Sequence, residues 1–422
     1  MLTKIGFEAL RLVYSLLLLI ALPALFIRLL IKSLKLPAYR QRWLERIGIN
    51  PLPQLERSLW IHAVSVGEVE VAKTLIPHLK IQHPGLPIVV TTTTPTGSAA
   101  IRQSKMADFH CYLPFDLSGF IKRLIDKIQP QALIVIETEL WPNLVSCASA
   151  NGPVILANAR LSEKSQAGYA KLGFIMPFWL NQISLLCCAD TFSKHRFSEL
   201  GYTQTLETTG NIKFDSIPVQ ERQHNDSPST WIAASTHAEE EAIAIRVHQA
   251  LLQQQPQTQL LLAPRHPDRF DEVFQLIKVS GLSHQKTSQS NGAIAPSYEA
   301  SIVLLDEMGQ LKQRYREADI AFIGGSLAPL GGHNVLEPIA AGTPTITGPN
   351  VRNFQAIVDT LQQEQVLTIV ENEQALLHAL QSFFERPAPF QVQVESAQDR
   401  LLSMQGSARK TAEAIQAILG ES

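Results

Sequence analysis

The chain has 422 residues, of which 45% are hydrophobic and 18% are charged, and this is enough apolar material for two globular domains. Its formal net charge of -2 at pH 7 excludes the overall basic field of a nucleic-acid-binding protein, so no nucleic-acid partner is expected. The four cysteines show no paired spacing for a metal ion. We expect buried thiols in a reducing compartment, with a disulfide as the less favoured alternative.

The N-terminus is a long apolar segment. No charged residue occurs from Leu12 to Ile27, and the mostly apolar stretch 9–31 covers about 23 residues, which is sufficient for a membrane helix. A cleaved signal peptide is the alternative, because residues 21–24 offer a small-residue site. The basic flank favours an uncleaved anchor with the remainder of the chain in the cytoplasm, bound to anionic membrane lipids: Arg28, Lys32, Lys35, Arg40, Arg42 and Arg46. Residues 1–35 are therefore predicted to be a membrane anchor, and whether it spans the bilayer fully stays open.

Short apolar runs then alternate with helical patterns, which predicts an α/β fold with parallel sheets. The polar stretch 216–230 contains two prolines and indicates a linker. We expect a first doubly wound domain over 36–215 and a second over 231–422, which closes on a helical pattern at 396–419. The predicted strands are 60–64, 87–91, 132–136 and 154–157, followed by 231–234, 259–263, 302–305, 320–323 and 344–347.

Ligands of doubly wound sheets bind at the carboxyl ends of the strands, so residues at those positions are candidates for the site. Glu68 follows the first strand of the first domain. It is either the third helical residue of a capping box with Ser65 or a general base that the helix N-terminus keeps ionised. The sequence leaves both interpretations open.

Other polar residues end further strands of the first domain. Thr94 lies in a threonine-rich turn, and Glu139 follows the next strand end together with Glu137. Arg160 suits an acceptor phosphate, and Lys213 lies just before the linker. Polar turns, helix caps and ordinary surface charges are the alternatives for all of them.

A glycine-rich segment follows strand 320–323 of the second domain. It includes Gly324, Gly325 and Ser326 and leads to a helix predicted to begin at Asn334. Bare backbone N–H groups at a helix start bind anions, and Glu337 one turn later could accept hydrogen bonds from ribose hydroxyls. The alternative is a structural turn in which Glu337 caps its own helix.

Three more candidates end strands in the second domain: Ser235, Arg265 and His266. An arginine opposite a glycine-rich helix start can bind phosphate bidentately. No Asp-x-Asp pair follows a strand, so we expect Arg265, backbone N–H groups and the helix dipole to neutralise the phosphate without a metal ion. No cofactor is expected. His237, which follows the same strand as Ser235, is a further candidate.

Taken together, nine segments in order resemble the 3-deoxy-D-manno-octulosonic acid (Kdo) transferases of lipopolysaccharide assembly. The chain departs from the family pattern at Val335, where proline is expected, and 191–204 match no pattern. The matching segments are 62–68, 91–97, 113–117, 137–143, 158–162, 167–171, 213–215, 263–266 and 324–338.

The resemblance implies a GT-B fold, in which two Rossmann-like domains face a cleft, and an inverting transfer of Kdo from CMP-Kdo to a tetra-acylated lipid A precursor. It implies a location at the cytoplasmic face of the bacterial inner membrane. Glu68 would be the base, and Glu139, Arg160, Lys213 and Thr94 would be candidates for Kdo or acceptor contacts. The donor contacts would be Ser235, Arg265, His266, Gly324, Gly325, Ser326, Asn334 and Glu337.

Two alternatives remain after this resemblance. One is another GT-B enzyme with a different nucleotide sugar, such as a UDP-sugar transferase or a 2-epimerase. The other is a membrane-tethered scaffold protein that has kept the fold without the activity.

Overall fold

The computed structural model describes residues 2–220, 229–289, 300–352, 354–363 and 365–420. The chain forms two compact units, Met1–Ser216 with Met404–Ser422, and Ile217–Ser403. This differs from the predicted division, because residues 404–422 join the first unit and not the second. Residues 221–228 of the predicted linker lie outside the described residues.

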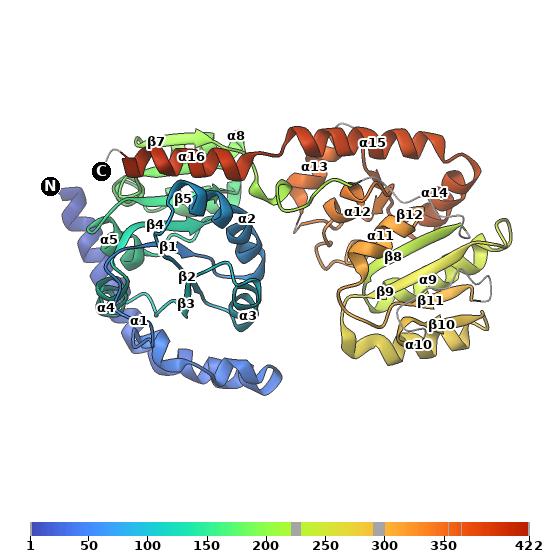
Figure 1. Ribbon diagram of the computed structural model, residues 1–422, viewed down its shortest axis with the longest axis horizontal. Coiled ribbons are helices and arrows are strands. Elements are labelled where there is room, and N and C mark those ends of the chain that lie inside the picture. The colour runs from blue at the N-terminus through green and yellow to red at the C-terminus, as the bar shows by residue number, and fades with distance from the viewer. Residues whose placement is uncertain (1, 221–228, 290–299, 353, 364, 421–422) are drawn as a thin grey trace. The chain divides into compact units, whose positions relative to one another are not determined.

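The return of the C-terminus has a clear physical cause (Figure 1). The helix predicted at 396–419 is interrupted near Gly406, which has a φ of +90°. It forms parts of two helices, α15 (Ala388–Ser403) and α16 (Ser407–Gly420). The Asp215 carboxylate accepts hydrogen bonds from the Gly406 and Ala408 N–H groups at 2.9 and 2.6 Å, which caps α16. Ala412 and Ile415 of α16 then pack in a core shared with α2 (Val66–Gln82).

The first unit is a doubly wound sheet of parallel strands. Among the described residues seven strands pair in the order β3-β2-β1-β4-β5-β6-β7. The order reverses between β1 and β4, and such a reversal opens a crevice at the carboxyl edge. The strands are β1 (Ser58–His62), β2 (Ile88–Thr92), β3 (Phe109–Tyr112), β4 (Pro130–Ile136), β5 (Val154–Ala159), β6 (Leu185–Cys188) and β7 (Thr205–Thr208).

Both faces of this sheet are covered. Trp60 contributes to one core and Ile61 to the other, because successive side chains of a strand point to opposite faces. The four cysteines are buried and free in the structure. Besides α2, the helices of the unit are α3 (Pro95–Ser104), α4 (Ser118–Ile128), α5 (Pro142–Ser149), α6 (Glu163–Ala170), α7 (Ile175–Leu180) and α8 (Thr191–Glu199).

The second unit repeats the same architecture. Its described strands pair in the order β10-β11-β9-β8-β12-β13-β14, all parallel, with the reversal between β8 and β12. The strands are β8 (Thr230–Thr236), β9 (Gln259–Pro264), β10 (His284–Lys286), β11 (Ile302–Leu304), β12 (Ile320–Ile323), β13 (Thr345–Thr347) and β14 (Thr368–Ile369). The helices are α9 (Ala238–Leu251), α10 (Phe270–Val279), α11 (Leu311–Glu317), α12 (Leu336–Ala340), α13 (Gln355–Gln363), α14 (Glu373–Glu385) and α15.

The N-terminal segment is one helix, α1 (Leu2–Lys35), and belongs to the first unit. Within the described part of the chain it is the one helix that is long and apolar enough to cross a membrane, judged by length and composition. Two short 3₁₀ turns, η1 (Pro37–Arg40) and η2 (Trp43–Ile47), connect it to the sheet.

Candidate active site

Glu68 lies at the carboxyl end of β1, in the first turn of α2, and is only 7% exposed. Its carboxylate accepts hydrogen bonds from the Val64 N–H and, at 3.1 Å, from the Ser65 hydroxyl. Ser65 makes no side-chain bond to the helix backbone, and Glu68 bonds the N–H of Val64 and not that of the N-cap residue Ser65, so neither bond of a capping box is present. The capping-box interpretation is therefore wrong, and the carboxylate lies where the sheet topology places a ligand site.

Burial, together with the negative charges of Glu139 and Glu137, raises the pKa of Glu68 to about 7 against the opposing hydrogen bonds from Val64 and Ser65. The expectation that the helix N-terminus keeps this carboxylate fully ionised at neutral pH is wrong, because desolvation outweighs the local donors. A pKa near neutrality is the value that suits a general base.

Glu139 and Glu137 therefore both lie close enough to Glu68 to influence its charge. Glu139 accepts a hydrogen bond of 2.8 Å from the Trp141 indole N–H, and burial raises its pKa. Glu137 forms an ion pair of 2.7 Å with Lys213, which lies in η3 (Ile212–Phe214). Three carboxylates and one ammonium group thus meet at the carboxyl ends of β1, β4 and β7.

Two residues at this edge have left-handed backbone conformations, which are uncommon outside glycine. Glu137 ends β4 with a φ of +61°, and Asn158 in β5 has a φ of +56°. Asn158 is fully buried and accepts a hydrogen bond of 3.0 Å from the Ile212 N–H, while its amide nitrogen has no hydrogen-bond partner within the described residues. Such conformations gather at functional sites, and no role for Asn158 was predicted from the sequence.

The two remaining candidates of the first unit, Thr94 and Arg160, form hydrogen bonds that hold loops of the protein in place. The Thr94 hydroxyl caps α3 through the Gly97 N–H at 3.1 Å and contacts the Val64 carbonyl at 3.2 Å, so it shapes the turn that carries Glu68. Arg160 bonds Thr138 through its backbone, with its N–H 3.1 Å from the hydroxyl, and its side chain is partly exposed.

The glycine segment after β12 has a partner that the sequence did not show. The carboxylate of Glu240, a buried residue of α9, accepts hydrogen bonds of 2.7 to 3.3 Å from four consecutive backbone N–H groups. The expectation that these groups are bare is therefore wrong: the protein's own carboxylate occupies the anion site. The four donors belong to Gly325, Ser326, Leu327 and Ala328.

The segment is tightly packed around this carboxylate. A Cβ at Gly324 would lie 2.8 Å from the Glu240 Oε2 atom, and a Cβ at Gly325, which has a φ of +67°, would lie 2.9 Å from the His333 ring. The Ser326 hydroxyl donates to the Ile323 carbonyl and accepts from the Gly348 N–H at 2.8 Å. Direct contact between this hydroxyl and a ligand would require breaking these bonds.

Three imidazoles lie beside the glycine segment. The Nε2 atoms of His237 and His333 are 3.0 Å apart and must share one proton, and the ring of His266 packs 5.3 Å from that of His237. Burial, and to a lesser extent positive charge at Arg265, His237 and His266, lowers the pKa of His333 to about 4. Arg265 and His266 are exposed, so the guanidinium of Arg265 is accessible to an anion beside these imidazoles.

Asn334 links the end of the glycine segment to Glu337. The predicted helix begins at Leu336 and not at Asn334, whose amide oxygen accepts the Leu336 N–H at 3.1 Å. The Asn334 amide nitrogen donates to Glu337 at 3.3 Å, which fixes that carboxylate.

Ser235, with a φ of +55°, and Arg265 line a small cavity of about 80 Å³ at the same carboxyl edge, together with Phe270, Leu305 and Met308. A larger groove of about 570 Å³ lies at the opposite edge, around Leu252 and Gly281. Its walls contain none of the strand-end candidates, so we place the candidate site at the small cavity.

Two doubly wound units with polar strand ends at their carboxyl edges define the GT-B class of glycosyltransferase fold. The crystal structure of UDP-GlcNAc 2-epimerase from Neisseria meningitidis has this fold: it is 12% identical, with a TM-score of 0.57, over 87% of this chain and 100% of that one. The crystal structure of the C-terminal CMP-Kdo binding domain of WaaA from Acinetobacter baumannii is 31% identical, with a TM-score of 0.40, over 42% of this chain and 90% of that one.

The family is identified by sequence. Residues 41–216 match the family model described as 3-deoxy-D-manno-octulosonic-acid transferase. The 3-deoxy-D-manno-octulosonic acid transferase of Haemophilus influenzae is 41% identical over 391 residues, which are 88% of this chain and 90% of that protein. The chain therefore belongs to the 3-deoxy-D-manno-octulosonic acid transferase family of glycosyltransferases, as its nine motifs predicted.

Proposed function

We propose that the protein transfers Kdo from CMP-Kdo to a hydroxyl of a tetra-acylated lipid A precursor at the cytoplasmic face of the bacterial inner membrane. The observation that carries this proposal is Glu68, a buried carboxylate with a pKa of about 7 at the carboxyl edge of the first unit. The acceptor hydroxyl would attack the anomeric carbon as its proton passes to Glu68. The bond to CMP would break with its electron pair on the phosphate, and the configuration would invert.

The carboxylate environment supports a base in this position. An acceptor hydroxyl becomes nucleophilic only as its proton is removed, and a base with a pKa near the working pH removes it best. Glu139 and Glu137 hold the Glu68 pKa up. Arg160 and Lys213 are the nearby cations that we propose for the Kdo carboxylate or an acceptor phosphate, and Glu139 and Thr94 would position the acceptor.

We propose that the second unit binds the CMP portion. Arg265, with His266 beside it, would bind the phosphate, and Glu337, fixed by Asn334, would accept the ribose hydroxyls. The cavity at Ser235 offers Phe270, Leu305 and Met308 to a flat heterocycle. The positive charge would come from side chains, so the reaction would proceed without an added metal ion or cofactor.

The glycine segment would act through its shape. Glu240 occupies four of its N–H groups, so Gly324, Gly325 and Ser326 would hold the loop in place for the donor. Their role in donor binding would then be indirect, through the position of His333 and of the turn that leads to Asn334.

Mass spectrometry of the lipid product tests this proposal. A tetra-acylated lipid A precursor is incubated with CMP-Kdo and wild-type protein, Glu68→Gln or Glu70→Gln, an exposed glutamate of the same helix. We expect a gain of Kdo mass with the wild type and Glu70→Gln, and a rate roughly 10²- to 10⁴-fold lower with Glu68→Gln. Equal rates for all three would refute the base assignment.

Calorimetric binding of CMP and UDP to the wild type separates the proposed donor from that of other GT-B enzymes. Tighter binding of CMP is expected. A clear preference for UDP, or folded wild-type protein that makes no Kdo product over a range of detergents and lipids, would refute the proposed donor and reaction.

A further inference from the structure

The helix α1 contacts the first unit along nearly its whole length. Near its start, the Phe7 ring packs 6.2 Å from that of Trp179. Further along, the Phe26 ring packs 5.5 Å from that of Phe115. The 19 residue steps from Phe7 to Phe26 correspond to about 29 Å of helix at about 1.5 Å per residue, which is close to the roughly 30 Å of a bilayer core.

The middle of α1 is also bound to the unit, and by polar groups. The Ser15 hydroxyl accepts a hydrogen bond of 2.9 Å from the Asn143 amide. The Tyr14 hydroxyl is hydrogen-bonded to the Asp116 carboxylate, which also accepts the Asn143 N–H at 3.0 Å. If α1 crossed the membrane, these polar partners and the α/β unit that carries them would have to enter the hydrocarbon. Polar and ionisable groups are costly there.

Two opposite faces of α1 therefore have different surroundings. Buried or partly buried positions recur at helical spacing and face the unit: Phe7, Arg11, Tyr14, Ser15, Leu18, Leu22, Phe26, Leu29 and Ser33. The other face is apolar and exposed, with Leu12 at 72%, Ile20 at 69%, Ile31 at 61% and Leu34 at 75% of full exposure. An exposed apolar strip of this length needs a lipid or protein partner.

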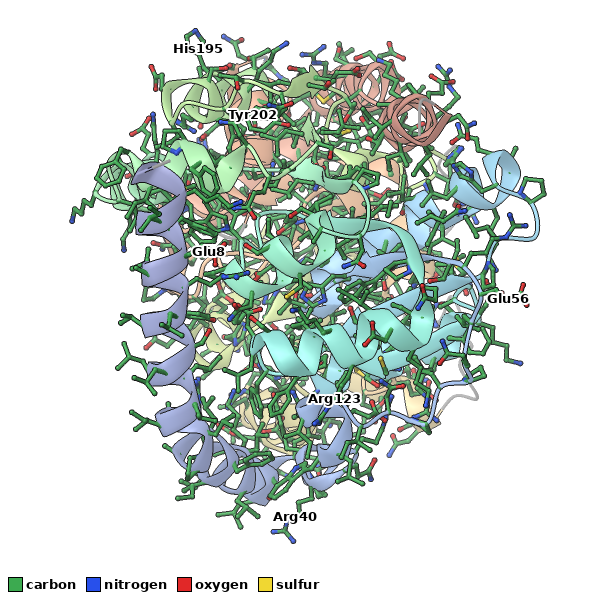
Figure 2. All side chains as sticks on the ribbon, turned by 90° about the vertical axis from the view of Figure 1, so that its left-hand side faces the viewer. Glu8, Arg40, Glu56, Arg123, His195 and Tyr202 are labelled. Carbon is green, nitrogen blue, oxygen red and sulfur yellow. The ribbon has the colours of Figure 1, made fainter. Side chains whose placement is uncertain are left out.

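The charges of α1 indicate which partner it is. Arg28, Lys32 and Lys35 are exposed and follow one another at spacings of four and three, so they line one flank between the two faces. Cations beside an apolar strip are typical of helices that lie in the interface of an anionic membrane. Figure 2 shows α1 running down one side of the unit and bending towards Arg40, and Pro23 inside the helix accounts for a bend.

We propose that α1 does not cross the bilayer but lies in the plane of one leaflet, with its exposed apolar face in lipid and its other face on the first unit. This arrangement rests on the geometry of the unit alone, whereas its assignment to the cytoplasmic leaflet rests on the proposed function.

The in-plane helix places the reaction edge of the first unit at the membrane. Phe26 packs 5.5 Å from Phe115, which follows β3, and Ser15 contacts Asn143, which follows β4. Both partners lie beyond the carboxyl ends of parallel strands, the edge that also carries Glu68. A lipid acceptor could then reach the base with its acyl chains still in the leaflet.

Depth measurements distinguish an in-plane from a spanning helix. A fluorophore is attached to a single added cysteine, Ile5→Cys, Leu19→Cys or Leu34→Cys, in full-length protein bound to vesicles of phosphatidylcholine and phosphatidylglycerol. The native cysteines are buried, which limits background labelling. Nitroxide lipids that quench at different depths are expected to place all three probes at the same shallow depth. A deep Leu19 between two shallow ends would overturn the proposal.

Labelling from the two sides of the membrane gives an independent result. Lys4→Cys and, as a matched control on α16, Lys410→Cys are treated with a membrane-impermeant maleimide in spheroplasts and in inside-out vesicles. The in-plane helix predicts that both react from the same side, and reaction from opposite sides would overturn it. If both react in spheroplasts, the in-plane arrangement stands and the cytoplasmic location of the proposed function fails.

Discussion

The Glu240 carboxylate lies 2.7 Å from the backbone nitrogen of Gly325, which is 85 residues later in the chain. The Oε1 atom of this carboxylate accepts from the next three N–H groups, and the Oε2 atom that binds Gly325 also accepts from the His237 N–H at 3.2 Å. One buried anion thus links the start of α9 to the glycine loop and to the histidine pair. The loop is held in shape before any ligand binds.

Replacing Glu240 is therefore expected to weaken donor binding without touching the donor. Glu240→Gln keeps one acceptor oxygen but turns an N–H donor towards the loop N–H groups, and a buried unsatisfied donor costs about 1–3 kcal/mol. We expect CMP affinity to fall at least tenfold and the melting temperature to drop by several degrees. The measurement is calorimetric titration of CMP together with thermal unfolding.

The adjacent Glu239 offers the control for this variant, because it is exposed on the same helical turn. Glu239→Gln should leave both quantities unchanged. A Glu240→Gln protein that binds CMP as tightly as the wild type would show that the loop does not depend on this carboxylate.

The pH dependence of the reaction follows from the raised pKa of Glu68. The base works when ionised, so kcat/KM is expected to rise with pH through about 7 and then to level off. Removing the negative charge of Glu139 lowers the Glu68 pKa, so Glu139→Gln should move this rise to lower pH. Pre-steady-state or initial-rate profiles from pH 5 to 9 measure the shift. An unmoved profile would mean that Glu139 does not influence the titrating group.

The raised pKa of Glu68 also lowers the free energy of unfolding at high pH. Its pKa is about 7 in the folded chain and 4.5 as a model value, so the folded state holds more protons between these values and stability falls as pH rises through this window. Glu68→Gln removes this loss and keeps an acceptor for Val64. Denaturant unfolding should show an inactive variant that is more stable than the wild type at pH 8 and gains little at pH 4. A variant destabilised equally at both pH values would contradict this.

Much of the fold could be predicted from the sequence, because strands buried on both faces are continuous apolar runs. Strand 320–323 was predicted with the bounds of β12. In contrast, the prediction lacks five of the described strands: β3, β6, β7, β10 and β14. The residues of β7 are mostly exposed and have no apolar pattern, and β14 has only two residues. The return of α16 to the first unit depends on Gly406 and on a carboxylate cap from Asp215, 191 residues earlier in the chain, and no local pattern shows that contact.

For the candidate site, the sequence predicted where the residues lie but not their protonation or their hydrogen-bond partners. It placed Glu68 and Arg265 at strand ends because sheet topology alone determines that edge. It could not predict the pKa of Glu68, which depends on burial and on charges about 70 residues away, or the occupation of the glycine loop by Glu240. The left-handed conformation of Asn158 left no sequence signal, because asparagine also fills ordinary turns.

The proposed absence of a metal requirement has a direct test. Product formation is expected to proceed at the same rate after dialysis against EDTA and in the presence of added Mg²⁺, because the Arg265 guanidinium would supply the positive charge. Arg265→Gln should lose at least tenfold in CMP affinity under both conditions. A rate that falls with EDTA and returns with Mg²⁺ would refute this part of the proposal.

CMP binding should be linked to the protonation of His333. The pKa of this imidazole is about 4 because of burial and the positive charges of Arg265, His237 and His266, and a bound phosphate dianion would oppose those charges and raise it. Binding would then take up protons, and the pKa of His333 is expected to be higher in the CMP complex than in the free protein. Histidine NMR titration with and without CMP measures the shift.

His248 is the internal control for this measurement, because burial lowers its pKa to about 4 as well. It forms hydrogen bonds with Trp231 and Ser301, away from the three imidazoles, and its pKa should not respond to CMP. Equal shifts at His248 and His333, or none at either, would exclude phosphate binding beside His333.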